Sequence, residues 1–142
     1  MYVTISTDAL ATIRAHVSAS GKREACGLLL GTGSRVDQAV ACPNVAADPA
    51  CRFEIDPAML LAAHRSARSG GLAVLGCYHS HPSGSSIPSA RDAAAAAADG
   101  TLWLIVGACE ARIWRAVANG AVESRFDPVP CEVAAAVPEG AK

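Results

Sequence analysis

The chain has 142 residues, enough for one domain with its own core, and 51% of them are hydrophobic while only 18% are charged. This balance excludes an intrinsically disordered chain. Twelve basic residues against thirteen acidic ones give a formal net charge of −1 without a basic stripe, so nucleic acid is not indicated as a partner.

Hydrophobic periodicity and turn residues divide the chain into short strands interspersed with three helices. We predict strands over 2–5, 24–30, 35–42, 52–55, 72–79, 102–106, 112–117 and 122–126. We predict helices over 7–20, 57–69 and 89–98. This order of elements indicates an α/β (α+β) sandwich on a mixed sheet.

Several local signals set the ends of these elements. Ser6 or Thr7 can cap the first helix, and Asp56-Pro57 is a typical helix start, with a cap followed by proline at the first helical position. Six consecutive alanines over 93–98 favour the third helix, and Asn119-Gly120 predicts a hairpin turn. We expect the domain to occupy 1–127 and 128–142 to form a loose tail.

The six cysteines and the hydropathy of the chain bear on its compartment. No two cysteines form a Cys-x-x-Cys pair, which argues against a zinc ribbon or a thioredoxin-like motif. The sequence has no secretory signal and no run of about 18 apolar residues, so we expect no membrane partner. A reduced, cytoplasmic protein is therefore expected.

One short motif carries most of the chemistry. Two of the four histidines, His79 and His81, are two residues apart and face the same side of an extended segment. Pro82 keeps the pair extended, and Ser89 opens the next helix, which carries Asp92. Two imidazoles and one carboxylate make a three-ligand site with an open fourth position, which is typical of catalytic rather than structural zinc.

Each part of this motif also has a simpler interpretation. A His-x-His pair alone is weak, and Ser89-x-x-Asp92 is also a capping box. Cys77 shares a strand face with His79 and could be a ligand instead, although a buried core cysteine is the better interpretation. We interpret His16 and His64 as surface or satisfied histidines and Trp103 and Trp114 as core residues.

The linked pattern His79-x-His81-Pro82-x6-Ser89-x2-Asp92 resembles the signature of the JAMM (MPN+) metallopeptidases, small bacterial type. The segment from Glu24 to Gly31 resembles the family's glutamate-bearing strand, and further similarity extends over roughly residues 2–126. The resemblance implies a cytidine-deaminase-like α-β-α fold with a curved sheet. It also implies Zn²⁺ held by His79, His81 and Asp92.

The resemblance further implies two catalytic residues and a substrate class. Glu24 would be the general acid–base, although by itself it could be a solvated charge at a strand end, and Ser89 would stabilise the developing oxyanion. The implied partner is a ubiquitin-like or sulfur-carrier protein with a C-terminal Gly-Gly tail, which the enzyme would process or deconjugate. The sequence does not indicate an oligomeric state.

Two other functions fit parts of the pattern. Two histidines and a carboxylate also form the facial triad of non-haem iron oxygenases, although a ligand on an alanine-rich helix argues against that class. A non-catalytic MPN-type interaction module would share the fold, but such modules usually lack the ligands that are present here.

Overall fold

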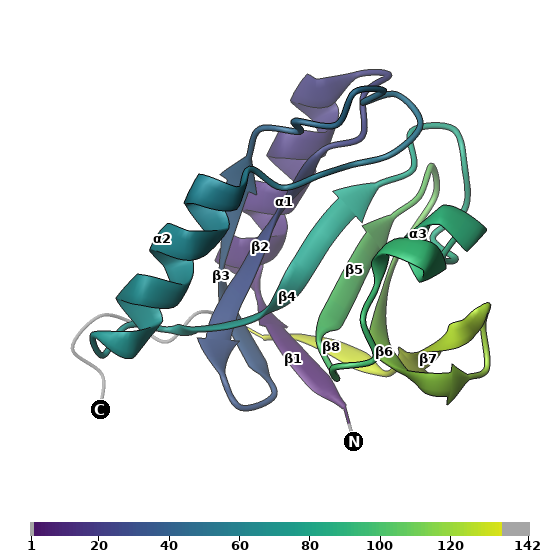
Figure 1. The fold of residues 1–142 in the computed structure, drawn as a ribbon. Coiled ribbons are helices and arrows are strands. Elements are labelled where there is room, and N and C mark those ends of the chain that lie inside the picture. Colours follow the sequence, from purple (N-terminus) through teal and green to yellow (C-terminus); the bar gives the residue numbers. More distant parts are fainter. Residues whose placement is uncertain (1, 135–142) are drawn as a thin grey trace.

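The computed structural model describes residues 2–134, and its eight strands form one sheet in the order β7-β6-β5-β4-β2-β3-β1-β8 (Figure 1). The strands are β1 (Val3–Ser6), β2 (Cys26–Thr32), β3 (Arg35–Cys42), β4 (Ala73–Ser80), β5 (Leu102–Val106), β6 (Ala111–Gly120), β7 (Ser124–Val129) and β8 (Cys131–Ala134). The helices are α1 (Thr7–Ser20), α2 (Pro57–Arg68) and α3 (Ala90–Ala95).

The sheet is mixed, as predicted. Strands β2 and β3 form an antiparallel hairpin, β4 pairs antiparallel with β2, and β5 runs parallel to β4. Figure 1 shows the sheet curling from β4 through β5 toward β6 and β7. The carboxyl ends of β4 and β5 therefore lie together, and the loops that follow them meet at one end of the sheet.

Side chains of β5 alternate between two hydrophobic clusters, one on each face of the sheet. Leu102 and Leu104 pack in the cluster that includes Ile13 of α1. Trp103 and Ile105 pack in the opposite cluster, which includes Ala96 directly after α3. Helices therefore cover both faces, and the predicted sandwich is confirmed.

The first two helices begin where the sequence indicates. The Ser6 side chain accepts a hydrogen bond from the backbone N–H of Ala9, and the Asp56 side chain accepts one from Ala58. Pro57 occupies the first turn of α2, where its missing N–H costs no helical hydrogen bond. Capping chemistry alone was sufficient to locate both starts.

The third helix is shorter than predicted because it ends at Ala95. Ala96 is extended, with φ −82° and ψ 136°, and packs with Trp103 and Trp114 in the cluster beneath the helix. Helix propensity is a weak preference that tertiary packing overrides. The chain therefore leaves the helix despite the alanines that follow.

Two predictions about β structure are also wrong in detail. Gly120 pairs with Ser124 inside the β6–β7 ladder, so the connection is 121–123 rather than Asn119-Gly120. A register shift between Ala116 and Gly120 moves the turn along the chain. The strand expected over 52–55 is reduced to one bridge, between Asn44 and Ile55.

The segment beyond residue 127 differs from the expected loose tail over residues 128–134. Strand β7 continues to Val129, and β8 pairs in parallel with β1 at the edge of the sheet. Backbone hydrogen bonding to β1 orders this segment, although its side chains show little hydrophobic pattern. The expectation for 135–142 lies outside the described residues.

None of the helices between residues 2 and 134 is long and apolar enough to span a bilayer.

Candidate metal centre

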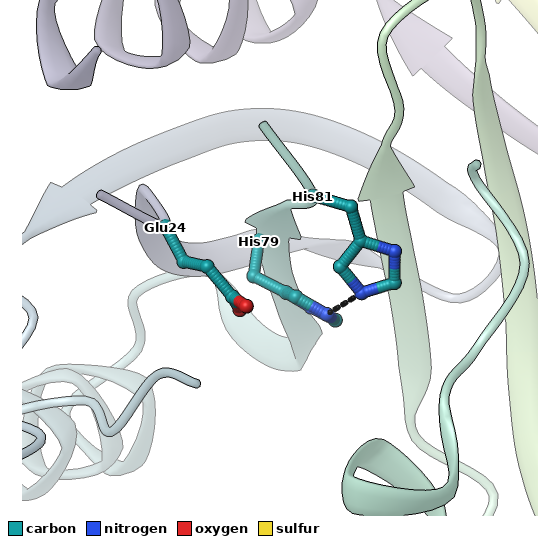
Figure 2. A group of neighbouring side chains, drawn as sticks. All are labelled: Glu24, His79 and His81. Carbon is teal, nitrogen blue, oxygen red and sulfur yellow. Dashed lines mark hydrogen bonds between the residues drawn. The ribbon is translucent and has the colours of Figure 1, made fainter. Parts of the chain in front are cut away.

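The two motif histidines lie at the carboxyl end of β4, and their rings meet edge to face. His79 pairs with Cys26 of β2 and with Ile105 of β5, which fixes its backbone on both sides. The chain stays extended through His81, whose N–H donates to Val106 at 2.8 Å. The two Nε2 atoms lie 3.1 Å apart (Figure 2).

Asp92 of α3 reaches the same point from the other side of the loop. Its Oδ1 lies 3.1 Å from Nε2 of His79, and its Oδ2 lies 3.1 Å from Nε2 of His81. Ligands about 2.1 Å from a tetrahedral Zn²⁺ lie about 3.4 Å from one another. The residues present therefore fit a small cation.

The hydrogen bonding of His81 decides which of its ring nitrogens could bind a metal. Its Nδ1 lies 2.7 Å from the carbonyl oxygen of Ser85, which can only accept, so Nδ1 carries the hydrogen. Nε2 of His81 faces His79 and Asp92: without a metal its proton is donated to Asp92, and once that proton is lost its lone pair is directed at the same point. This arrangement fixes the tautomer that a metal ligand requires.

The pKa values of the three groups agree with this picture. Burial lowers the pKa of His79, which is fully buried. Burial would also lower the pKa of His81, but its hydrogen bond to Asp92 raises that pKa overall. Although burial alone would raise the pKa of Asp92, the hydrogen bonds from both histidines hold it well below its usual value. Asp92 is therefore a carboxylate, and a metal would compete with protons only at the histidines.

Glu24 lies beside this cluster, two residues before the start of β2. One of its carboxylate oxygens and one nitrogen from each of His79 and His81 lie within 4.8 Å of one another, and Figure 2 shows its side chain directed at the rings. Its Oε1 is buried without a hydrogen-bond partner among residues 2–134. Burial raises the pKa of Glu24 to about 7. The carboxyl group can thus gain or lose a proton near neutral pH.

Ser89 caps α3 and belongs to a complete capping box. Its Oγ accepts from the backbone N–H of Asp92 at 3.1 Å, and its own N–H donates to Oδ2 of Asp92 at 2.9 Å. The capping interpretation of these two residues is confirmed. Because the Ser89 hydroxyl is an acceptor in this cap, its own proton remains available for donation. The N–H of Ser89 also orients the Asp92 carboxylate, which contacts both histidines.

Two residues hold the backbone around Glu24 in place, a role that was not predicted for them from the sequence. Ser80 accepts a hydrogen bond from the N–H of Ala25 at 2.8 Å, and Asn44 donates one to the carbonyl of Glu24 at 3.0 Å. Asn44 also donates to the carbonyl of Arg52 at 3.0 Å. The sequence offered two signals for this role: Ser80 stands between the two motif histidines, and Asn44 follows a predicted strand.

The loop between His81 and α3 is hydrogen-bonded to β6 and to the β5–β6 connection. The carbonyl of Ser86 accepts from the indole Nε1 of Trp114 at 2.9 Å, and Oγ of Ser86 donates to Glu110 at 3.1 Å. Ala108 donates its N–H to the carbonyl of Gly84 at 2.9 Å. These bonds hold the Ser85 carbonyl where it contacts His81.

Among residues 2–134, none of the alternative candidates is grouped with Glu24, His79 and His81 as a possible metal ligand. Burial raises the pKa of the Cys77 thiol, which packs with the aromatic cluster and stays protonated. Nδ1 of His16 is hydrogen-bonded to the Tyr78 hydroxyl at 2.7 Å, and His64 is exposed on α2. Trp103 and Trp114 are core residues, as predicted.

Two openings lead to the cluster, and Arg91 lines both. One opening, of about 490 Å³, is bounded by Glu24, His81 and Ser89. The other, of about 470 Å³, is bounded by Arg52 and Asp92. Nη1 of Arg91 lies 3.5 Å from the carbonyl of Cys51, which connects α3 to the facing loop. A substrate can therefore approach the cluster from either side of Arg91.

Comparison with known proteins agrees with the fold. The sequence profile of the family described as "Prokaryotic homologs of the JAB domain" matches residues 6–117. The fold and the matching profile define a small domain of the JAB/MPN class. The chain belongs to this family, the small prokaryotic branch of JAMM/MPN+ proteins.

Two relatives and one solved structure are similar to the chain. A desampylase of Haloferax volcanii is 34% identical over 109 residues, which cover 72% of this chain and 78% of that protein. A probable TtuB-protein conjugate cleaving protease of Thermus thermophilus is 38% identical over 79 residues, 56% of this chain. That alignment spans 53% of the Thermus protein, about half its length. A Desulfitobacterium hafniense protein solved in solution has a TM-score of 0.81 at 24% identity, covering 99% of this chain and 98% of that one.

Proposed function

We propose that this chain is a zinc metallopeptidase that hydrolyses an amide or isopeptide bond at the C-terminus of a ubiquitin-like or sulfur-carrier protein. The observation that carries the proposal is the meeting of two imidazole nitrogens and one carboxylate at separations of 3.1 Å. Family membership supports the reaction class. Relatives named for desampylation and for cleaving TtuB conjugates support the substrate class.

In this proposal, His79, His81 and Asp92 would hold Zn²⁺ and leave one position open to the substrate. When bound, Zn²⁺ would supply a Lewis acid that makes water nucleophilic near neutral pH. Burial of the three side chains, of which His81 is the most exposed at 14%, keeps bulk water from competing for them. The Ser85 carbonyl and the capping box orient His81 and Asp92 in advance.

Glu24 would take a proton from the attacking water and later deliver it to the leaving amine. A carboxyl group with a pKa of about 7 suits both steps, because each protonation state is accessible at the working pH. Ser89 would donate its hydroxyl proton to the oxyanion that develops on the substrate carbonyl, which is worth about 10²–10³ in rate.

The partner in this proposal is a protein whose extended Gly-Gly tail enters the opening between Glu24 and Ser89. Only a narrow, flexible tail could bring a backbone carbonyl between two side chains that flank a buried cluster. All six cysteines are free thiols, which supports a reducing, cytoplasmic location.

The test is hydrolysis of a ubiquitin-like carrier that carries one residue beyond Gly-Gly, followed by intact mass. We expect the added residue to be released by metal-loaded protein and not after chelation. Glu24→Gln should retain metal and lose hydrolysis, whereas Glu54→Gln makes the same change at an exposed position and should leave turnover unchanged.

Other outcomes would point to other functions. Wild-type turnover in Glu24→Gln would remove Glu24 from the mechanism. Bound iron with oxygen consumption would indicate an oxygenase. Carrier binding without cleavage by the metal-loaded protein would indicate an interaction module.

A further inference from the structure

Arg91 is the one positively charged side chain lining both openings to the cluster, among residues 2–134. It lies between Ser89 and Asp92 in sequence, so its backbone belongs to the capped first turn of α3. Arg91 and Glu24 line the same opening, together with His81 and Ser89. A guanidinium therefore stands close to the proposed acid–base group.

The guanidinium of Arg91 has unused hydrogen-bonding capacity. It carries five N–H donors, and the bond to the Cys51 carbonyl, at 3.5 Å, is long and weak. Arg52 lines the opening beyond Asp92 and forms no ion pair within the described part of the chain. Of the acidic residues there, Asp92 is already bonded to both histidines and Asp48 is exposed.

The leaving group of the proposed reaction must lie near Glu24, which protonates its amine. If that amine belongs to a terminal amino acid, its α-carboxylate is only two bonds away and lies in the same opening. The planar guanidinium matches a carboxylate with two parallel hydrogen bonds. A lysine side chain in an isopeptide has no carboxylate at that distance.

We propose that Arg91, with Arg52 behind it, forms a carboxylate subsite that selects substrates whose leaving group is an amino acid with a free α-carboxylate. The inference rests on the proposed function and names its substrate class. The hydrolysis itself consumes water and yields the carrier's terminal carboxylate and a free amino acid. The chain is then an enzyme that trims one residue from a carrier tail in preference to cutting isopeptides.

The experiment uses full-length, metal-loaded protein and three forms of one ubiquitin-like carrier ending in Gly-Gly. The first carries one additional alanine with a free carboxylate, the second carries the alanine as its amide, and the third is joined to the ε-amine of lysine amide. Initial rates are read from intact mass for the wild type, Arg91→Met and Arg52→Met. Arg68→Met removes an exposed cation from α2, outside both openings, and is the matched control.

We expect the wild type to prefer the acid over the amide by about ten-fold, the effect of one charged hydrogen-bonded contact. Arg91→Met should remove that preference by slowing the acid alone, Arg52→Met should reduce it partly, and Arg68→Met should keep it. Equal rates for acid and amide in the wild type overturn the subsite, as does an equal loss on both substrates in Arg91→Met. Absence of cleavage of all three forms defeats the proposed function itself, so the two failures are distinguishable.

Discussion

The indole Nε1–H of Trp114, on β6, donates a buried 2.9 Å hydrogen bond to the carbonyl of Ser86, in the loop that follows the motif histidines. The preceding carbonyl, that of Ser85, is the one that fixes His81. A core tryptophan 28 residues along the chain from Ser86 thus holds the backbone on which a candidate ligand depends.

We expect Trp114→Phe to weaken metal binding by about ten-fold, as is typical when a residue that orients a ligand is lost. The aromatic ring is kept, so the main change is the hydrogen bond to the loop. Titration of the metal-free variant with Zn²⁺ measures the affinity. Phe126→Leu removes volume from the same cluster without touching the loop, and it should lower stability alone. Equal affinity in Trp114→Phe and wild type would contradict the role of this bond.

Removing a candidate ligand should remove the metal. We expect His79→Ala or Asp92→Ala to purify without stoichiometric zinc, because either change leaves two of three ligands. His64→Ala removes an exposed histidine of α2 and should bind zinc like the wild type. Elemental analysis after dialysis measures the zinc bound per protein chain. One equivalent of zinc in either ligand variant would show that the ion, if bound, lies elsewhere.

The buried carboxyl of Glu24 should make the stability of the metal-free protein depend on pH. Burial raises its pKa from 4.5 to about 7, so the folded state binds the proton more tightly than the unfolded state. Folding therefore becomes less favourable as the pH rises through this interval, and the loss is complete above the folded pKa.

Glu24→Gln removes this dependence, and the other titrating groups are shared by both proteins. With chelator present, the variant should gain stability relative to the wild type between about pH 4.5 and 7, and the difference should level off above that range. Denaturant unfolding at several pH values measures it. A difference in stability that stays constant with pH would mean that Glu24 is not buried in the folded protein.

Gly76 allows β4 and β5 to approach each other. A Cβ at this position would overlap the backbone of Leu102, the residue it pairs with on β5. We expect Gly76→Ala to destabilise the fold by at least about 2 kcal/mol, because a backbone cannot move aside cheaply. Gly84→Ala is the control, since its nearest neighbour is the Cβ of His81 at 3.3 Å. Equal unfolding midpoints for the two variants would disprove the crowding.

The sequence predicted the helix starts and most strands, because caps, prolines and alternation act over a few residues. The predictions failed where distant parts of the chain compete with local preference. Burial of Ala96 beneath α3 ends a helix that alanine would extend. Pairing with β1 orders residues 131–134, whose own pattern indicates no strand.

For the candidate site, the sequence by itself determined the types of ligand and their spacing, since two histidines on one strand face and a capping Ser-x-x-Asp follow from local geometry. The tertiary structure alone decided that Glu24, 55 residues before His79, lies beside the cluster. It also decided that Arg91 faces both openings and that Trp114 supports the loop. The physical reason is that local chemistry specifies what a segment can form, while packing of the whole sheet decides which segments meet.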